Sequence, residues 1–117
     1  MTVFPIRNKF VFALLSAIVG IAHGTTVPRV DGARLVDSMS RTDNGPYANA
    51  ERHVMTGYLA GVADATEGKD WCGTGRVKSG EIDSDVLGEL RKLPRDALKA
   101  GAAGLIVNAL RQKYPCR

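Results

Sequence analysis

Apolar residues recur every three or four positions along most of the chain, a spacing typical of helices that bury one face. The longest such run lies between Pro46 and Ala65, and Pro46 suits the first turn of a helix. No segment alternates apolar and polar residues long enough to indicate a strand. The pattern therefore predicts an all-α fold, in which four helices surround one core. The apolar positions of the long run are Tyr47, Val54, Met55, Tyr58, Leu59 and Val62.

Residues that favour helix ends separate the four runs. Short polar side chains can accept hydrogen bonds from the first free N–H groups of a helix, whereas glycine and proline commonly end one. The expected N-caps of the first, third and fourth helices are Asp31, Ser79 and Asp96, and the expected stops of the second and third are Gly68 and Pro94.

Two glycines and an acid form a stripe on the second helix. Gly57 and Gly61 are four residues apart, and each costs the helix about 1 kcal/mol relative to alanine. That spacing lets another backbone approach closely, so we expect a packing groove there. Asp64 lies on the same stripe, and we expect it to turn toward the core as a hydrogen-bond acceptor or, alternatively, to contact a partner.

The first residues resemble an export signal. Arg7 and Lys9 precede an apolar run over residues 10–22, which ends at Ala22-His-Gly24 with small residues suited to signal peptidase. We expect residues 1–24 to be a Sec-type signal peptide, residues 25–117 to form one domain in the periplasm, and no membrane anchor to remain after cleavage. The alternative is an uncleaved anchor helix, but that usually needs about 20 apolar residues.

The mature chain contains two cysteines, Cys72 and Cys116. An even number in a small exported domain favours a disulfide over two buried free thiols. Closing a loop of about 45 residues would stabilise the fold by about 4 kcal/mol. That is a large contribution for a mature domain of about 93 residues, whose core alone gives marginal stability.

Charge and candidate chemistry narrow the function. Removal of the signal peptide takes away two cations and lowers the net charge from +4 to +2. The remaining cations are dispersed among acids without interleaved aromatic residues, which argues against nucleic-acid binding. His53 is then the only histidine, and no nucleophile with a base, metal cluster or phosphate-binding loop is evident. We expect no catalytic residue, no metal, no cofactor and no enzymatic activity.

Several motifs taken together resemble the Rap/Tai (type VI amidase immunity) family. They are the string Gly-Tyr-x-x-Gly-x-x-Asp formed by Gly57, Tyr58, Gly61 and Asp64, the pair Trp71-Cys72, and the terminal Tyr-Pro-Cys116. The resemblance covers the chain from about Leu35 to Cys116. It implies a small helical periplasmic protein, often a homodimer, that binds and blocks a peptidoglycan-cleaving type VI secretion effector, here a cell-wall amidase.

The loop after Cys72 is the expected partner-binding segment. An inhibitor that occludes a cleft needs a protruding, preorganised segment, and the disulfide and the third helix would fix the two ends of this one. The alternatives are an ordinary exposed connection here and a binding surface at the connection over residues 41–45. The expected partner-binding residues are Gly73, Thr74, Gly75, Arg76 and Lys78.

Two other functions remain open from the sequence. A periplasmic acid-stress chaperone resembling HdeA is also small, helical and closed by one disulfide, and it would expose apolar surface when carboxylates are protonated. An accessory subunit of an enzyme is the third possibility.

Overall fold

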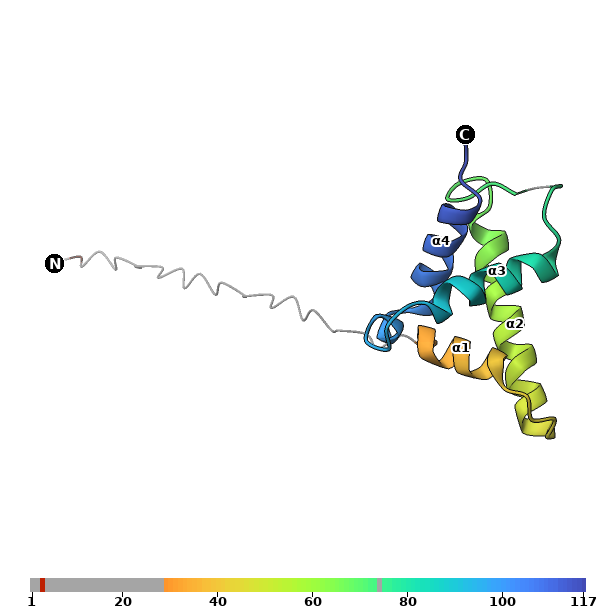
Figure 1. The fold of residues 1–117 in the computed structure, drawn as a ribbon. Helices are drawn as coiled ribbons and strands as arrows, with labels where there is room; N and C mark the ends of the chain where they lie inside the picture. The colour runs from red at the N-terminus through yellow and green to blue at the C-terminus, as the bar shows by residue number, and fades with distance from the viewer. Residues whose placement is uncertain (1–2, 4–28, 74) are drawn as a thin grey trace.

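The structure is a computed structural model that describes residue 3, residues 29–73 and residues 75–117. These residues form the helices α1 (Gly32–Ser40), α2 (Pro46–Thr66), α3 (Ser79–Arg91) and α4 (Ala102–Lys113), with a short 3-10 helix η1 (Ala97–Lys99) before α4 (Figure 1). Within this part of the chain there is no strand, only two isolated bridges. The prediction of a four-helix, all-α fold is confirmed. The predicted signal peptide over residues 1–24 lies outside the described residues.

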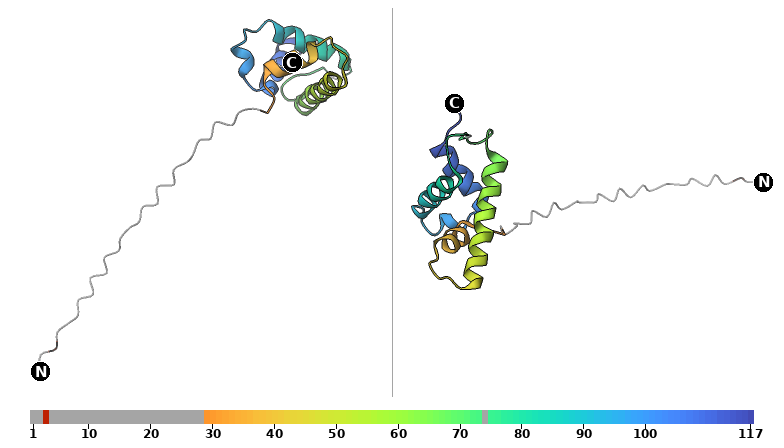
Figure 2. Two further views of the ribbon diagram at one scale, coloured as in Figure 1. Left: turned by 90° about the horizontal axis from the view of Figure 1, so that it is seen from below. Right: turned by 90° about the vertical axis from the view of Figure 1, so that its right-hand side faces the viewer.

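Helix α2 forms one side of the domain, and the other helices pack against its inner face (Figure 2). The inner face is a single stripe, because Ala48, Met55, Leu59 and Ala63 are buried at steps of seven and four residues. None of the helices that the structure describes is long and apolar enough to cross a membrane.

The helix starts follow the sequence in part. Asp31 caps α1, because its Oδ1 accepts a hydrogen bond from the Arg34 N–H at 2.7 Å. The expected cap of α3 was wrong by one residue. Lys78 is the N-cap, Ser79 is already helical, and the Glu81 carboxylate accepts the Lys78 N–H at 3.0 Å. Glu81 therefore satisfies the N–H of the cap residue itself, whereas the serine was expected to accept an N–H from inside the first turn.

The fourth helix starts later than its apolar pattern predicts. Asp96 caps no helix with its side chain and instead pairs with Lys99 at 2.9 Å. The chain forms η1, turns, and begins α4 at Ala102, whose N–H donates to the Val30 carbonyl at 2.9 Å. This long-range hydrogen bond fixes the start of α4 against the segment before α1.

The glycine at a close helix contact is Gly32, not Gly57 or Gly61. A Cβ on Gly32 would lie 2.5 Å from the Leu105 side chain, whereas a Cβ on Gly57 or Gly61 would meet nothing within 4 Å. The expected packing groove against this chain's own helices is therefore wrong. The expectation that Asp64 turns toward the core is wrong as well, since this residue is exposed.

The outer face of α2 carries residues that the apolar pattern placed inside. Tyr47 and Val54 are 79% and 57% exposed, and Tyr58 is half-buried. Alanines occupy the inner positions at both ends of α2, so small residues are buried where larger apolar residues are exposed. The largest fully buried side chains of the core are Trp71, Leu35, Met55, Leu59, Leu90, Ile106, Leu110 and Val86.

Candidate partner-binding site

A disulfide between Cys72 and Cys116 joins the segment after α2 to the segment after α4, as the sequence predicts. The two Cα atoms are 4.8 Å apart, and the Cys72 N–H also donates to the Tyr114 carbonyl at 2.8 Å. The loop that leaves Cys72 therefore starts beside the C-terminal segment (Figure 1). The two segments are therefore joined by a covalent bond and by a backbone hydrogen bond.

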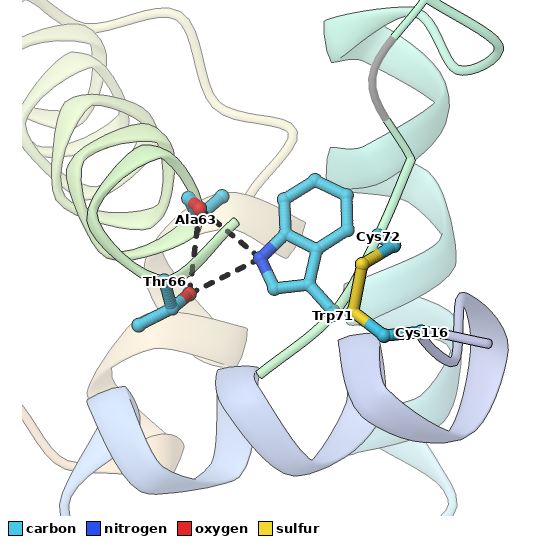
Figure 3. The surroundings of a disulfide bond; sticks show 5 residues. All are labelled: Ala63, Thr66, Trp71, Cys72 and Cys116. Atoms are coloured by element: carbon cyan, nitrogen blue, oxygen red, sulfur yellow. Dashed lines mark hydrogen bonds between the residues drawn. A yellow bond between two sulfur atoms is a disulfide. The ribbon is translucent and has the colours of Figure 1, made fainter. Parts of the chain in front are cut away.

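Trp71 is buried next to the disulfide and directly precedes Cys72 in the chain. Its indole N–H points at the end of α2 and donates to the Ala63 carbonyl and the Thr66 hydroxyl, both at 3.1 Å (Figure 3). Its ring also lies 6.0 Å from that of Tyr114, centroid to centroid. A buried tryptophan with its N–H satisfied is a rigid support. The ring therefore has little freedom to move when the loop above it changes.

The loop between Cys72 and α3 begins in close contact with the Trp71 ring. Gly73 is buried, and a Cβ there would lie 2.7 Å from the Trp71 ring and 3.3 Å from the Val77 side chain. The Arg76 N–H donates to the Gly73 carbonyl at 3.1 Å, which closes a four-residue turn. Gly75 occupies the third position of that turn with φ +75°, a conformation that favours glycine.

Two adjacent hollows lie on either side of Arg76, Val77, Lys113 and Tyr114, which line both. The first hollow is about 310 Å³ in volume. Cys72 and the loop after it form one wall, and the residues next to Cys116, including Arg117, form the other. We call this first hollow the disulfide hollow. The second hollow, about 550 Å³, continues along the start of α3.

The acids near these hollows are already engaged within the chain. Asp85 accepts a hydrogen bond from the Tyr114 hydroxyl and lies 3.6 Å from the Lys113 amine, and Glu81 accepts a hydrogen bond from the Lys78 N–H. The hydrogen bond to Asp85 favours the protonated phenol and raises the pKa of Tyr114 to about 12. Tyr114 therefore acts near neutral pH as an uncharged donor that holds Asp85 in place.

The cations of the loop are free by comparison. Arg76 and Lys78 are exposed, and among the described residues neither forms an ion pair; the same holds for Arg117. Arg76, Lys78 and Arg117 therefore present positive charge that no ion pair among the described residues neutralises.

The described residues of the predicted loop have different environments. Gly73 is buried beneath the loop, whereas Gly75, Arg76 and Lys78 are exposed, and Thr74 lies outside the described residues. Gly57, Tyr58, Gly61 and Asp64 belong to α2 and line neither hollow.

Sequence reasoning missed Lys113, Tyr114 and Arg117 as neighbours of the loop. One signal could have found them: residues adjacent to Cys116 must lie near residues adjacent to Cys72 once the two are bonded. Pairing of the cysteines thus predicts that cations from the end of the chain approach Arg76.

The connection over residues 41–45, the alternative surface, has its charges paired internally. The Arg41 guanidinium donates to both oxygens of Asp43, at 3.0 and 2.9 Å, and lowers the pKa of that carboxyl from its ordinary value. Arg52 donates to the carbonyls of Arg41 and Asp43 at 2.9 and 3.1 Å. These groups are less available to a partner than Arg76 is.

Fold and site together define a small helical, disulfide-closed domain that presents a basic loop, an arrangement suited to binding another protein. The family model of the Rap1a immunity proteins matches residues 31–116, so the chain belongs to this immunity protein family. The match confirms the resemblance found in the sequence. Membership of this family implies that the chain binds a partner effector, and it supports a role as a type VI immunity protein. A search of the curated proteins found no match.

Proposed function

We propose that the mature protein is a periplasmic inhibitor that binds a peptidoglycan-degrading amidase effector of a type VI secretion system and has no enzymatic activity of its own. The sequence motifs support an amidase as the partner, and the predicted signal peptide supports the periplasm as the location. The lack of activity is expected because the sequence shows no set of catalytic residues. The disulfide supports an oxidising compartment. The family match supports immunity over the chaperone function that the sequence left open.

The observation that carries the proposal is the loop from Gly73 to Lys78. It is held by the disulfide at one end and by α3 at the other, and it rests on the buried ring of Trp71. A segment ordered before binding loses less conformational entropy when it enters a cleft. Arg76 and Lys78 are exposed at its surface, and arginine is a frequent hot spot of protein interfaces. We therefore place the inhibitory contact on this loop.

A homodimer is part of the same proposal. The exposed Tyr47 and Val54 give α2 an apolar patch on its outer face, on which a second copy could pack. Light scattering after size-exclusion chromatography measures the mass. A Val54→Asp variant should be monomeric if this face forms the dimer, and a monomeric wild type would contradict it.

The test of the function needs an exported amidase encoded beside this chain in its genome, which the proposal predicts. The purified protein should inhibit release of muropeptides by that amidase at a ratio of one inhibitor site to one enzyme, and by itself should release none. A double variant, Arg76→Glu with Lys78→Glu, should lose affinity by at least about a hundredfold, because two contacts become repulsive.

Lys99→Glu provides the matched control. Lys99 is exposed, precedes α4 at the end opposite the disulfide, and forms a surface pair worth less than about 1 kcal/mol. It should inhibit like the wild type. If the folded loop variant binds and inhibits the amidase like the wild type, the inhibitory contact is not on this loop. If the wild type does not bind the amidase, the proposed effector is wrong.

A further inference from the structure

The disulfide hollow combines three cations that arrive from two distant parts of the chain. Arg76 comes from the loop after α2, Lys113 from the last turn of α4, and Arg117 from the segment after Cys116. No aspartate or glutamate is among the residues that line this hollow. The charged side chains that line it are therefore all positive, in a domain whose charged side chains are otherwise mixed.

One neighbouring acid, Asp85, offsets part of this charge through its ion pair with Lys113, and Arg76 and Arg117 have no such partner among the described residues. Asp85 lies in the second hollow, where the Tyr114 hydroxyl holds it, and its 3.6 Å separation from the Lys113 amine exceeds a hydrogen bond. Lys113 thus keeps donors available on the side of the disulfide hollow. Arg76 has no ion-pair partner among the described residues, so its planar guanidinium can donate two parallel hydrogen bonds to a carboxylate.

The walls of the disulfide hollow are stiff. The Cys72–Cys116 bond and the Cys72 N–H to Tyr114 carbonyl bond tie the two sides together, and Gly73 packs on the buried Trp71 ring below. Its volume of about 310 Å³ is at the lower end of small-ligand sites, which suits one or two side chains of a partner. A stiff, positively charged hollow favours an anion over an apolar group.

We propose that the disulfide hollow is a receptor for a carboxylate-bearing peptide segment, and that the effector inserts an acidic loop between Arg76, Lys113 and Arg117. This inference rests on the proposed function, because it assigns the chemistry of the partner at that same surface. A protein partner supplies negative charge chiefly as aspartate and glutamate, which selects carboxylates over other anions.

The test measures binding of a defined probe, acetylated hexaglutamate amide, to the uniformly ¹⁵N-labelled oxidised protein by NMR titration at low ionic strength in phosphate-free buffer. Amide shifts should cluster at Gly73, Val77 and Tyr114, and hexalysine of the same length should produce none there. The double variant Arg76→Gln with Lys113→Gln should bind hexaglutamate at least about tenfold more weakly, since each lost charge-assisted bond is worth a factor of this order.

Lys99→Gln is the control, and its affinity should stay within about twofold of the wild type because its charge lies a whole helix away from the hollow. Thermal midpoints of all variants establish that each is folded. Amide shifts spread evenly over the surface, or equal affinities of the double variant and the control, would show that the hollow is not a carboxylate receptor.

The two proposals fail in different ways. If the amidase binds through Arg76 and Lys78 while hexaglutamate does not enter the hollow, the inhibitory loop stands and the carboxylate receptor is wrong. If hexaglutamate binds as expected while Arg76→Gln with Lys113→Gln leaves amidase inhibition unchanged, the hollow binds acidic peptides but the effector does not use it, and the inference is again overturned.

Discussion

Replacing Gly73 with alanine should destabilise the protein, whereas the same change at Gly57 should stabilise it. The added Cβ at position 73 would lie 2.7 Å from the Trp71 ring and 3.3 Å from the Val77 side chain. The Trp71 ring cannot move aside freely, because its N–H is bonded to Ala63 and Thr66. At Gly57 the added methyl group meets nothing within 4 Å.

The two changes differ in sign and size. Gly73 has no positive φ, so the effect of Gly73→Ala is steric, and overpacking of this kind costs about 2 kcal/mol. Gly57→Ala replaces a poor helix former in an exposed helix interior and gains about 0.5–1 kcal/mol. In a domain of this size, each 1 kcal/mol moves the thermal midpoint by about 4–8 °C.

The assay is thermal unfolding of the oxidised mature protein followed by circular dichroism, with the free energies checked by urea titration. Gly73→Ala should melt about 8–16 °C below the wild type and Gly57→Ala about 2–8 °C above it. Gly61→Ala, also open to solvent, is a second control and should behave like Gly57→Ala.

An unchanged midpoint for Gly73→Ala would refute the view that the loop is pressed against a fixed tryptophan ring. A large loss for Gly57→Ala would show that its outer face is covered, for example by a second copy. Gly73→Ala should also weaken amidase binding beyond its effect on stability, because a displaced ring moves the start of the loop that carries Arg76.

Three further outcomes are expected. Cys116→Ser should lower the free energy of unfolding by about 4 kcal/mol, because the bond closes a loop with a sequence separation of 44; equal midpoints for oxidised and reduced wild type would contradict this. The folded pKa of Tyr114, about 12, lies above its ordinary value of 10.0, so its bond to Asp85 stabilises the fold fully below pH 10 and is lost as the pH rises toward 12. Urea titrations should show a fall of about 1 kcal/mol over this range that Tyr114→Phe lacks, and equal falls would argue against the bond. Intact mass of periplasmic material should show a chain beginning at Thr25, and a species that retains residues 1–24 would refute the cleavage site.

Helix count and family could be predicted because both depend on local sequence. Periodic apolar residues need only a helix to be placed on one face, and Asp31 caps α1 through a contact three residues away. The disulfide was predictable for a different reason, since two cysteines allow only one pairing. The motifs around Gly57, Trp71 and Cys116 were sufficient for the family.

Burial on α2 could not be predicted in the same way. Apolar size favours Tyr47 and Val54 as core residues, yet Ala48 and Ala63 are buried in their place. Three helices pack against α2, and close packing of backbones selects small side chains at such contacts. Hydrophobic pattern alone does not reveal which stripe of a weakly amphipathic helix the other helices will cover.

The chain by itself determined the four helices, the covalent link between Cys72 and Cys116 and the basic character of the loop. Tertiary structure alone decided that Gly73 lies under that loop against the Trp71 ring, and that Lys113 and Arg117 stand beside Arg76 with no acid lining the hollow between them. The physical reason is distance along the chain. Local propensities act over a few residues, whereas a charged hollow is built from groups about 40 residues apart, which only the packing of α4 and the disulfide bring together.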